Sequence, residues 1–480
     1  MPLPAQRMAA ITILMAIWWI TEAIPIPATA LLPILLYPLL EIMDTAQVTI
    51  NYGHHLVFLF LGGFIIALTI ERWNLHRRIA LRLINLIGNN KRFVILGFMI
   101  ASAFLSMWIS NTATAMMMIP IGLAVISQFT EKTDESTFAL GKNNFALALM
   151  LGIAYASSIG GISTLIGTPP NVVFIGILKS NFPSAPEISF LKWMLFALPF
   201  SIVFLPLAWL YLVYIAAPVA VSGKKMDKSL LRSELENLGP MSRPEKYTLA
   251  VFLTTALLWM FRSDINLGFL DIPGWTTLIG LKDYITDSTV AIMMALTTFL
   301  IPAEKRDGKQ EFLMDWSCAG RIPWGILLLF GGGFALASGF QDSGLTRWMG
   351  EQLGAFGFLP VMVIILIVSA TTTLTTEFAS NTAMASTILP IVAGLAVAID
   401  LNPLLLMIPA TISSSTAFML PVATPPNAIV FGSGYIRIRD MVKIGIVMNL
   451  IGLILISIFI STTAPAIFDI DWNVLPHWTK

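Results

Sequence analysis

The sequence predicts an all-α polytopic membrane protein, an inverted repeat with two re-entrant helical hairpins and two broken helices. Of its 480 residues, 56% are hydrophobic and only 11% are charged, whereas soluble domains carry roughly 25% charged residues. The mean hydropathy is +0.82, and many apolar runs approach or exceed the ~20 residues that cross a bilayer as a helix. Polar signatures inside these runs recur in both halves of the chain.

The apolar runs define ten predicted spans and two longer segments with polar centres. The N-terminus lacks the basic start and the small-residue cleavage site of a signal peptide, so the first run is predicted to be a retained span. The spans fall at about 8–25, 27–41, 54–71, 145–177, 193–217, 247–262, 286–302, 323–340, 403–433 and 440–463. The two polar-centred segments, at about 92–127 and 359–399, are the predicted hairpins.

The two hairpins carry the same polar triplet, 270 residues apart. Ser110, Asn111 and Thr112 correspond to Ser380, Asn381 and Thr382. A Gly-Gly-Phe sequence at 62–64 recurs at 332–334 with the same offset, and GTPPN at 167–171 recurs as ATPPN at 423–427. These matches divide the chain into a first repeat, 1–217, a cytoplasmic loop, 218–246, and a second repeat, 247–480.

Lysine and arginine set the predicted orientation, because cytoplasmic loops are enriched in both. If the two hairpins enter and leave the membrane on the same side, most of the 28 basic residues fall on one face. Both chain ends then lie outside. The first hairpin opens to the cytoplasm and the second to the outside. Such inverted repeats are typical of secondary transporters.

Hairpin tips at membrane depth are suited to binding small ions. A turn between two half-helices leaves carbonyls and amides free, which is tolerated only where the turn is buried or lines a cavity. Neutral hydroxyl and amide oxygens suit a hard cation such as Na⁺. Helix N-termini favour anions by about 0.3–2 kcal/mol each. The prolines of each TPPN break a helix and free carbonyls near Thr168 and Thr424. Two tips meeting near the midplane would hold cations at the edges and an anion between them.

Structural alternatives exist for each of these residues. Ser, Thr and Asn also serve as hydrogen-bonding groups between membrane helices, worth roughly 0.6–2 kcal/mol per contact. Duplication of the triplet favours the functional interpretation. Glu22 and Glu377 are candidates as intramembrane acids, but a structural hydrogen-bonding role is favoured for both. His54 and His55 are interpreted as part of a solvated loop, and Cys318 as ordinary packing.

Composition also excludes several classes of function. The net charge of +1 gives no field for nucleic acid, and a single cysteine excludes an internal disulfide or a cysteine metal cluster. The sequence has no HExxH, P-loop or GxGxxG motif. An enzyme would need a nucleophile–base pair or a metal cluster, and a cation channel usually shows acidic rings. We therefore expect neither an enzyme nor an organic cofactor.

The paired SNT and TPPN signatures, with WWITEAIPIP at 18–27 and LFLGGF at 59–64, resemble the divalent anion/sodium symporter family. That family includes sodium-coupled dicarboxylate, citrate and sulfate transporters. The resemblance covers nearly the whole chain. It implies a homodimeric elevator-type transporter of the inner (plasma) membrane, in which a moving transport domain holds the two hairpins. Relatives usually carry another span before the WITEAIP segment. This chain starts almost at that segment, so about ten spans and an outer N-terminus are expected.

The resemblance also implies ligands, residue by residue. One sodium site would use Ser106, Ser110, Asn111 and the backbone near Gly160 and Gly161. A second would use Thr376, Ala379, Asn381 and the backbone at Ala423 and Pro425. The substrate carboxylates would meet Ser110, Asn111 and Thr112 at one tip and Ser380, Asn381 and Thr382 at the other, with Thr168 and Thr424 close by.

The expected function is Na⁺-coupled uptake of a C4-dicarboxylate such as succinate, malate or fumarate. Na⁺ would be the co-transported ion. Because neutral tips accept any small dianion, three alternatives stay open: a sulfate symporter, a tricarboxylate symporter, and a Na⁺-independent dicarboxylate exchanger of the same fold.

Overall fold

The computed structural model describes residues 1–88, 90–129, 143–220, 229–266, 271–306, 308–353, 359–472 and 474–479. The described part is mostly helical, and eight of its helices are long and apolar enough to cross a membrane. Two short antiparallel β-hairpins were not predicted: β1 (Ile265–Asn266) pairs with β2 (Asp271–Ile272), and β3 (Pro302–Arg306) with β4 (Lys309–Phe312). The predicted cytoplasmic lysines at 132, 142, 224, 225 and 228 lie outside the described residues.

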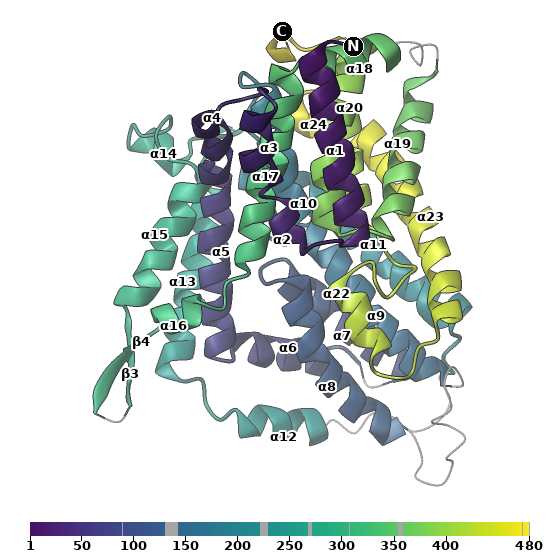
Figure 1. The fold of residues 1–480 in the computed structure, drawn as a ribbon. Coiled ribbons are helices and arrows are strands. Elements are labelled where there is room, and N and C mark those ends of the chain that lie inside the picture. The colour runs from purple at the N-terminus through teal and green to yellow at the C-terminus, as the bar shows by residue number, and fades with distance from the viewer. Residues whose placement is uncertain are drawn as a thin grey trace.

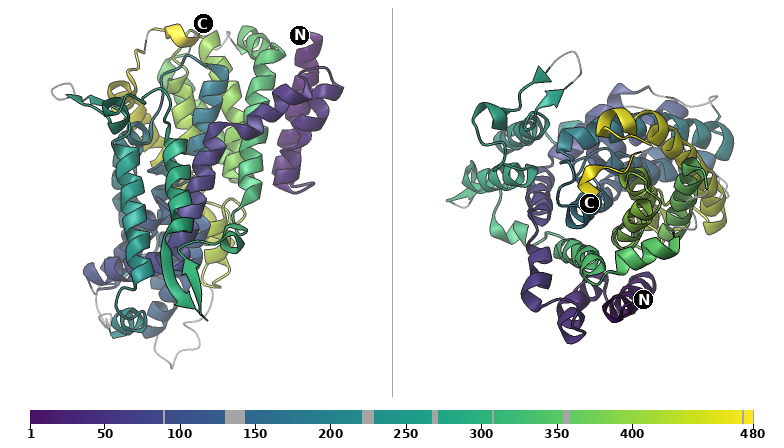
Figure 2. Two further views of the ribbon diagram at one scale, coloured as in Figure 1. Left: turned by 90° about the vertical axis from the view of Figure 1, so that its left-hand side faces the viewer. Right: turned by 90° about the horizontal axis from the view of Figure 1, so that it is seen from above.

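The chain begins with a pair of antiparallel helical segments at the rim of the molecule (Figures 1 and 2). Helix α1 (Leu3–Thr21) runs inward and ends at Glu22, whose φ is +49°. The chain returns through α2 (Ile26–Thr29) and α3 (Leu32–Leu39), both of which start beside prolines, as helices tolerate in their first turn. After α4 (Thr45–Ile50) and the 3₁₀ turn η1 (Asn51–Gly53), α5 (His55–Arg72) crosses to the opposite end.

The first predicted hairpin and broken helix are present. The amphipathic α6 (Leu75–Leu86) leads into α7 (Lys91–Ser106) and α8 (Asn111–Phe129), which are joined by a short tip. Then α9 (Asn144–Ile162) ends, and α10 (Pro169–Asn181) starts at the two prolines of the first TPPN. The break therefore falls where the prolines remove backbone donors.

The second half repeats this order with the hairpin opening to the other end (Figure 1). Helix α17 (Trp324–Asp342) is followed by α18 (Leu345–Leu353), the hairpin pair α19 (Val361–Thr376) and α20 (Asn381–Ala398), and the broken pair α21 (Leu404–Ser414) and α22 (Pro425–Phe431).

The remaining elements connect and flank the two halves. They are α11 (Phe190–Leu210) with its π-helical continuation η3 (Tyr211–Ala216), α12 (Ser229–Asn237), α13 (Arg243–Met260), α14 (Trp275–Leu278), α15 (Asp287–Leu300), α16 (Trp316–Ala319), α23 (Ile438–Thr462), α24 (Ala464–Phe468) and η5 (His477–Thr479).

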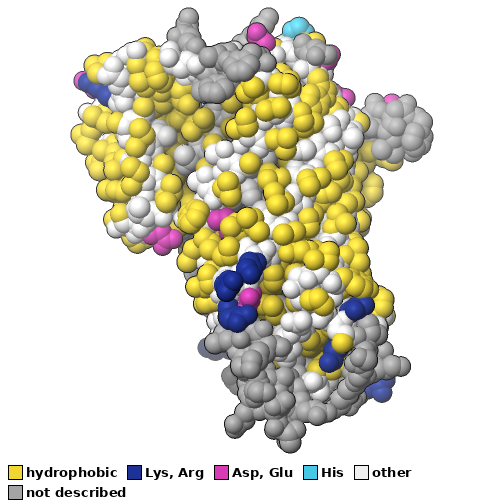
Figure 3. Space-filling model, turned by 90° about the vertical axis from the view of Figure 1, so that its right-hand side faces the viewer, with side chains coloured by type: hydrophobic (Ala, Val, Ile, Leu, Met, Phe, Trp, Pro, Cys, Tyr) yellow, Lys and Arg dark blue, Asp and Glu magenta, His cyan; other side chains and the backbone are white. Residues whose placement is uncertain are grey.

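Both chain ends lie at one end of the molecule, and α6 and α12 lie at the other (Figure 1). We call these the outer and inner ends, following the predicted orientation. The side face in Figure 3 is broadly hydrophobic, and most of its visible lysine and arginine atoms lie toward the inner end.

The repeated Gly-Gly-Phe sequence allows helices to approach closely. A Cβ on Gly62 would lie 2.6 Å from the carbonyl carbon of Ala291, so α5 and α15 touch through their backbones. A Cβ on Gly332 would lie 2.6 Å from the Ala30 carbonyl oxygen, after α2. The motif therefore serves helix packing, a common use of small residues in membranes.

Candidate binding site at the hairpin tips

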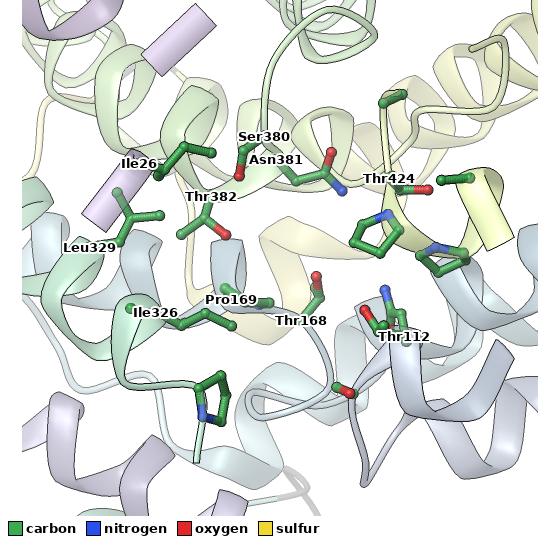
Figure 4. A pocket seen from close by; sticks show the side chains of 18 of the residues that line it. Ile26, Thr112, Thr168, Pro169, Ile326, Leu329, Ser380, Asn381, Thr382 and Thr424 are labelled. Carbon is green, nitrogen blue, oxygen red and sulfur yellow. The ribbon is translucent and has the colours of Figure 1, made fainter. Parts of the chain in front are cut away.

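A cavity of about 560 Å³ lies between the two hairpin tips (Figure 4). Every residue that the sequence placed against the substrate lines it: Ser110, Asn111, Thr112, Thr168, Ser380, Asn381, Thr382 and Thr424. Figure 4 shows Ser380 and Thr382 on one side of the cavity, with Thr112 and Thr168 across from them. The four segments that carry the two signatures, far apart in sequence, thus meet at one place.

The cavity is also lined by residues that were not predicted to belong to the site, some of them in the 18–27 and 59–64 motifs. These are Phe60 and Phe64 of α5, Ile26 and Pro27 of α2, and Pro323, Gly325, Ile326 and Leu329 at the start of α17. Glu22 is exposed and is the one charged side chain among the described lining residues. An anion in this cavity would therefore depend on neutral donors and on bound cations.

Four helices start at residues that line the cavity. Helices α8 and α20 begin at Asn111 and Asn381, and α10 and α22 begin at Pro169 and Pro425. Helix N-termini carry a partial positive charge, and the first amides of α8 and α20 have no partner within their helices. Helices α10 and α22 each begin with two prolines, which have no N–H, so their first residues add no donors. At the first tip, Ser110 Oγ accepts from the Ala113 amide at 3.2 Å. The arrangement favours a negatively charged ligand.

Oxygen atoms converge on the Asn111 side chain beside the first tip. Ser106 Oγ lies 2.5 Å from Asn111 Oδ1. The amide atom that faces Ser106 also lies 3.3 Å from the carbonyl oxygens of Ser157 and Gly167. If the oxygen and nitrogen of the amide exchange places, the nitrogen donates to all three of these oxygens. Sequence reasoning missed these two carbonyls, since every residue has one. Gly161 lies beside the amide, whereas Gly160 packs on α7, where a Cβ would be 2.2 Å from Ala103 O.

The second tip repeats the pairing of a hydroxyl with the tip asparagine, but its carbonyl contact is to the hydroxyl and not to the amide. Thr376 Oγ1 lies 3.0 Å from Asn381 Oδ1 and 2.8 Å from the Ser414 carbonyl oxygen. Thr376 stands five residues before Asn381, as Ser106 stands five residues before Asn111. Ala423 and Pro425 line the cavity, and Ala379 is buried just before the tip. A hydroxyl and an amide thus meet at each tip, with the Ser157 and Gly167 carbonyls beside the first and the Ser414 carbonyl beside the second.

Nearly the whole chain matches the sequence model of one protein family. The model of the sodium:sulfate symporter transmembrane region matches residues 1–468. The chain belongs to this family. The predicted family is confirmed, and so is the prediction of a multi-pass membrane transporter in place of an enzyme.

Two similar members of the sodium:sulfate symporter family carry the name sodium-dependent dicarboxylate transporter SdcS. The protein of Staphylococcus saprophyticus is 45% identical over 462 residues, which is 96% of this chain and 86% of that protein. The protein of Staphylococcus aureus is 44% identical over 473 residues, 98% of this chain and 88% of that protein.

Solved structures share the fold at low identity. The YdaH transporter of Alcanivorax borkumensis has a TM-score of 0.55 and 12% identity, covering 86% of both chains. MtrF of Neisseria gonorrhoeae has a TM-score of 0.54 and 11% identity, covering 96% of this chain and 94% of that one. At such identities the likeness concerns the fold alone.

In this family member the asparagine of each TPPN holds the break loop in place. Asn171 Nδ2 donates to the carbonyl oxygens of Thr164 at 2.7 Å and Ile162 at 3.2 Å. Asn427 Nδ2 donates to those of Ala417 and Leu420, both at 3.0 Å. The sequence analysis predicted the TPPN motif but no role for its asparagine. The recurrence of an asparagine after two prolines in both halves could have indicated this role.

Replacing Asn427 by Leu is expected to destabilise the protein by about 1–3 kcal/mol, because two buried carbonyls lose their donor. The thermal unfolding midpoint in detergent should fall. Asn144→Leu is the control, since that side chain makes an exposed bond to the Pro218 carbonyl and its loss should change little. Equal thermal midpoints for the two variants would contradict the role of Asn427 in holding the break loop.

Glu377 has the structural role that the sequence favoured. Its buried carboxylate accepts hydrogen bonds from the amides of Phe418, Met419 and Leu420 at 2.8–3.0 Å, and from Asn449 Nδ2 at 2.8 Å. It therefore joins the end of α19 to the loop of the second break and to α23. In the first half Met107 occupies the corresponding position, and its carbonyl accepts from Thr164 Oγ1 at 2.5 Å.

The histidine pair lies at the start of α5, and only His54 differs from the solvated interpretation. His55 is exposed, with Nδ1 3.2 Å from Ser288 Oγ. His54 is half-buried, because its ring packs on Phe334 of α17 with centroids 5.0 Å apart. Cys318 is half-buried on the short helix α16.

Gly161→Ala is expected to raise the Na⁺ concentration for half-maximal transport at least about tenfold. The added Cβ would lie 2.6 Å from Asn111 Oδ1 and 3.1 Å from the Gly167 carbonyl oxygen, and so would displace oxygens from a proposed cation site. A displaced charge-assisted bond costs about 1.5–3 kcal/mol. Gly53→Ala, where nothing lies within 4 Å of the added atom, is the control. An unchanged Na⁺ dependence in Gly161→Ala would place the cation elsewhere.

Proposed function

We propose that the chain is a Na⁺-coupled symporter that takes up C4-dicarboxylates such as succinate, malate or fumarate. The observation that carries this proposal is the cavity where both hairpin tips and both helix breaks meet. Relatives that are 44–45% identical over nearly the whole chain are named sodium-dependent dicarboxylate transporters, which supports both the ion and the substrate class.

In this proposal each tip holds one carboxylate of the substrate. Ser110, Asn111 and Thr112 would bind one carboxylate through hydroxyl, amide and helix N-terminal donors. Ser380, Asn381 and Thr382 would bind the other, with Thr168 and Thr424 beside them. Because no basic side chain is among the described lining residues, bound Na⁺ would supply the compensating charge. Substrate and ion binding would then be mutually dependent.

Two Na⁺ sites would flank the substrate. The first would use Ser106, Ser110, Asn111 and the backbone beside Gly160 and Gly161, to which the geometry adds the Ser157 and Gly167 carbonyls. The second would use Thr376, Ala379, Asn381 and the backbone at Ala423 and Pro425, with the Ser414 carbonyl added. Hydroxyl and carbonyl oxygens are the ligands that hard cations prefer.

We propose an elevator mechanism for this inverted repeat. Residues 1–217 and 247–480 would be the repeats and 218–246 the cytoplasmic loop. The hairpins and broken helices would move together past a scaffold that includes α5, α13 and α15. The support is that α7, α9 and α8 pack on one another, as do α10, α20 and α21, while α5, α13 and α15 pack mainly on one another. A homodimer would anchor the scaffold in the membrane.

The deciding experiment is uptake of labelled succinate into proteoliposomes that hold the purified protein, with and without an inward Na⁺ gradient. Accumulation that requires Na⁺ is expected. Uptake that ignores Na⁺ but requires internal dicarboxylate would show an exchanger. Absence of succinate uptake, with Na⁺-driven uptake of sulfate or citrate, would reassign the substrate. Liposomes without protein and a K⁺ gradient of equal size are the controls.

A further inference from the structure

A cluster of charged side chains lies at the outer end, away from the tip cavity. Arg262 follows α13, and its side chain is only 2% exposed. Its Nε donates to Asp287 Oδ1 at 2.5 Å, and another guanidinium nitrogen donates to Glu187 Oε1. A third donates to the Ile285 carbonyl at 3.0 Å. One buried arginine therefore joins two carboxylates.

The two carboxylates belong to different groups of helices. Asp287 begins α15, which packs with α13 and α5 in the proposed scaffold. Glu187 lies just before α11, which packs mainly on α9, α7 and α23 and also touches α13 of the scaffold. The Phe190 amide of α11 also donates to Asp287 Oδ2 at 2.8 Å. The cluster is thus a polar connection between the scaffold and the group that carries the hairpins.

The cluster borders a second cavity of about 200 Å³ between the same two groups. Its scaffold side includes His55 of α5 and Ser288 of α15, and the facing side includes Ile175 and Lys179 of α10. Leu165 lines this outer cavity, and its neighbour Ile166 lines the tip cavity. Both residues belong to the loop of the first helix break, so this loop lies between the tip cavity and the outer cavity.

We infer that the Glu187–Arg262–Asp287 cluster is a latch that keeps the binding site closed to the outer face and opens when the site becomes accessible from that face. The inference rests on the proposed function, because it assumes that the two helix groups move apart at this point. The inference is that the Arg262–Glu187 ion pair breaks during the transport cycle and that the Arg262–Asp287 pair stays.

The exposures of the two carboxylates show where the latch opens. The Glu187 side chain is 52% exposed, so water and salt screen its attraction to Arg262. The Asp287 side chain is 8% exposed and accepts from Arg262 Nε within the scaffold. Its second bond, from the Phe190 amide of α11, joins the two groups and would break together with the Glu187 pair. When Glu187 moves away, Arg262 keeps Asp287 as its partner within the scaffold. No buried charge is then left alone, which would be strongly unfavourable.

The test measures access to the outer cavity in oriented vesicles. Ile175 is 5% exposed and lines that cavity, so Ile175→Cys in a Cys318→Ser background reports its opening to an external membrane-impermeant maleimide. Glu187→Gln in this background should raise the labelling rate about two- to fivefold, the range expected for a pair with one half-exposed partner. Raised external salt should also increase the labelling rate of the parent protein, because salt screens the Arg262–Glu187 attraction. In Glu187→Gln the same salt should increase the rate much less.

Glu41→Gln is the matched control. It removes the Arg7–Glu41 pair at 3.0 Å, which also lies at the outer end but joins only α1 to the segment after α3. Unchanged labelling in Glu187→Gln, or an equal increase in Glu41→Gln, would overturn the latch. If Glu187→Gln lowers the thermal midpoint, the salt response of the parent protein decides. Failure of the proposed function would instead appear as an absence of Na⁺-driven succinate uptake by the parent, which is a separate measurement.

Discussion

Asn111→Ala is expected to abolish Na⁺-driven succinate uptake at low-millimolar Na⁺, and to raise the Na⁺ concentration for half-maximal uptake about 10- to 100-fold. The amide meets Ser106 Oγ at 2.5 Å and the carbonyls of Ser157 and Gly167 at 3.3 Å, and the residue also starts α8 at the cavity wall. Loss of a bond to a charged group costs about 1.5–3 kcal/mol, which is a 10- to 100-fold change in affinity.

The repeated geometry extends this expectation to the second half. Asn381→Ala should have an effect of the same size, because Thr376 Oγ1 donates to Asn381 Oδ1 as Ser106 Oγ does to Asn111 Oδ1. The measurement is initial uptake against Na⁺ concentration in proteoliposomes. Asn144→Ala, which alters an exposed bond to Pro218, should keep the parent's curve. A parent-like curve in Asn111→Ala would remove that residue from ion binding.

Glu377→Ala is expected to lower the free energy of unfolding by about 3–5 kcal/mol. It leaves the amides of Phe418, Met419 and Leu420 and the Asn449 side chain without their acceptor, and each buried donor left unpaired costs about 1–3 kcal/mol, only part of which water entering the smaller site recovers. Glu377→Gln should be nearly as harmful, because its amide NH₂ would face other donors. The loop that Glu377 holds precedes Ala423 and Thr424 at the cavity.

Thermal unfolding of the purified variants in detergent measures this effect. Glu22→Ala is the matched control, since Glu22 is exposed at the end of α1 and its carboxylate should contribute little to stability. Midpoints that fall equally in Glu22→Ala and Glu377→Ala would contradict the structural role of Glu377. A stable Glu377→Gln with altered Na⁺ dependence would instead assign the carboxylate to ion binding.

Several parts of the site were predictable because polar residues inside the hydrocarbon core of a membrane can occupy only a few kinds of position. Ser110, Asn111, Ser380 and Asn381 stand out in apolar segments, and their recurrence marks a shared task. Polar backbone at membrane depth must be buried or line a cavity, so the tips were expected to form a site. Their meeting in one cavity agrees with that expectation.

Other parts depend on contacts that leave no mark in the sequence. The Ser157, Gly167 and Ser414 carbonyls are chemically the same as any others, and only the positions of α9 and α21 beside the tips bring them to Asn111 and Thr376. Likewise, the sequence marks Phe60 and Phe64 only as residues of a membrane span. They line the cavity because α5 packs beside the tips.

The sequence by itself determined the membrane class, the two hairpins, the two helix breaks and the residues at their tips. These are local consequences of apolar length, of proline chemistry and of polar groups in hydrocarbon. Only the tertiary structure decided which carbonyls face each tip, what Glu377 and the TPPN asparagines hold, and that Arg262 joins Glu187 to Asp287. The physical reason is that hydrogen bonds and ion pairs act over a few ångströms, and which distant segments come that close is set by how the helices pack.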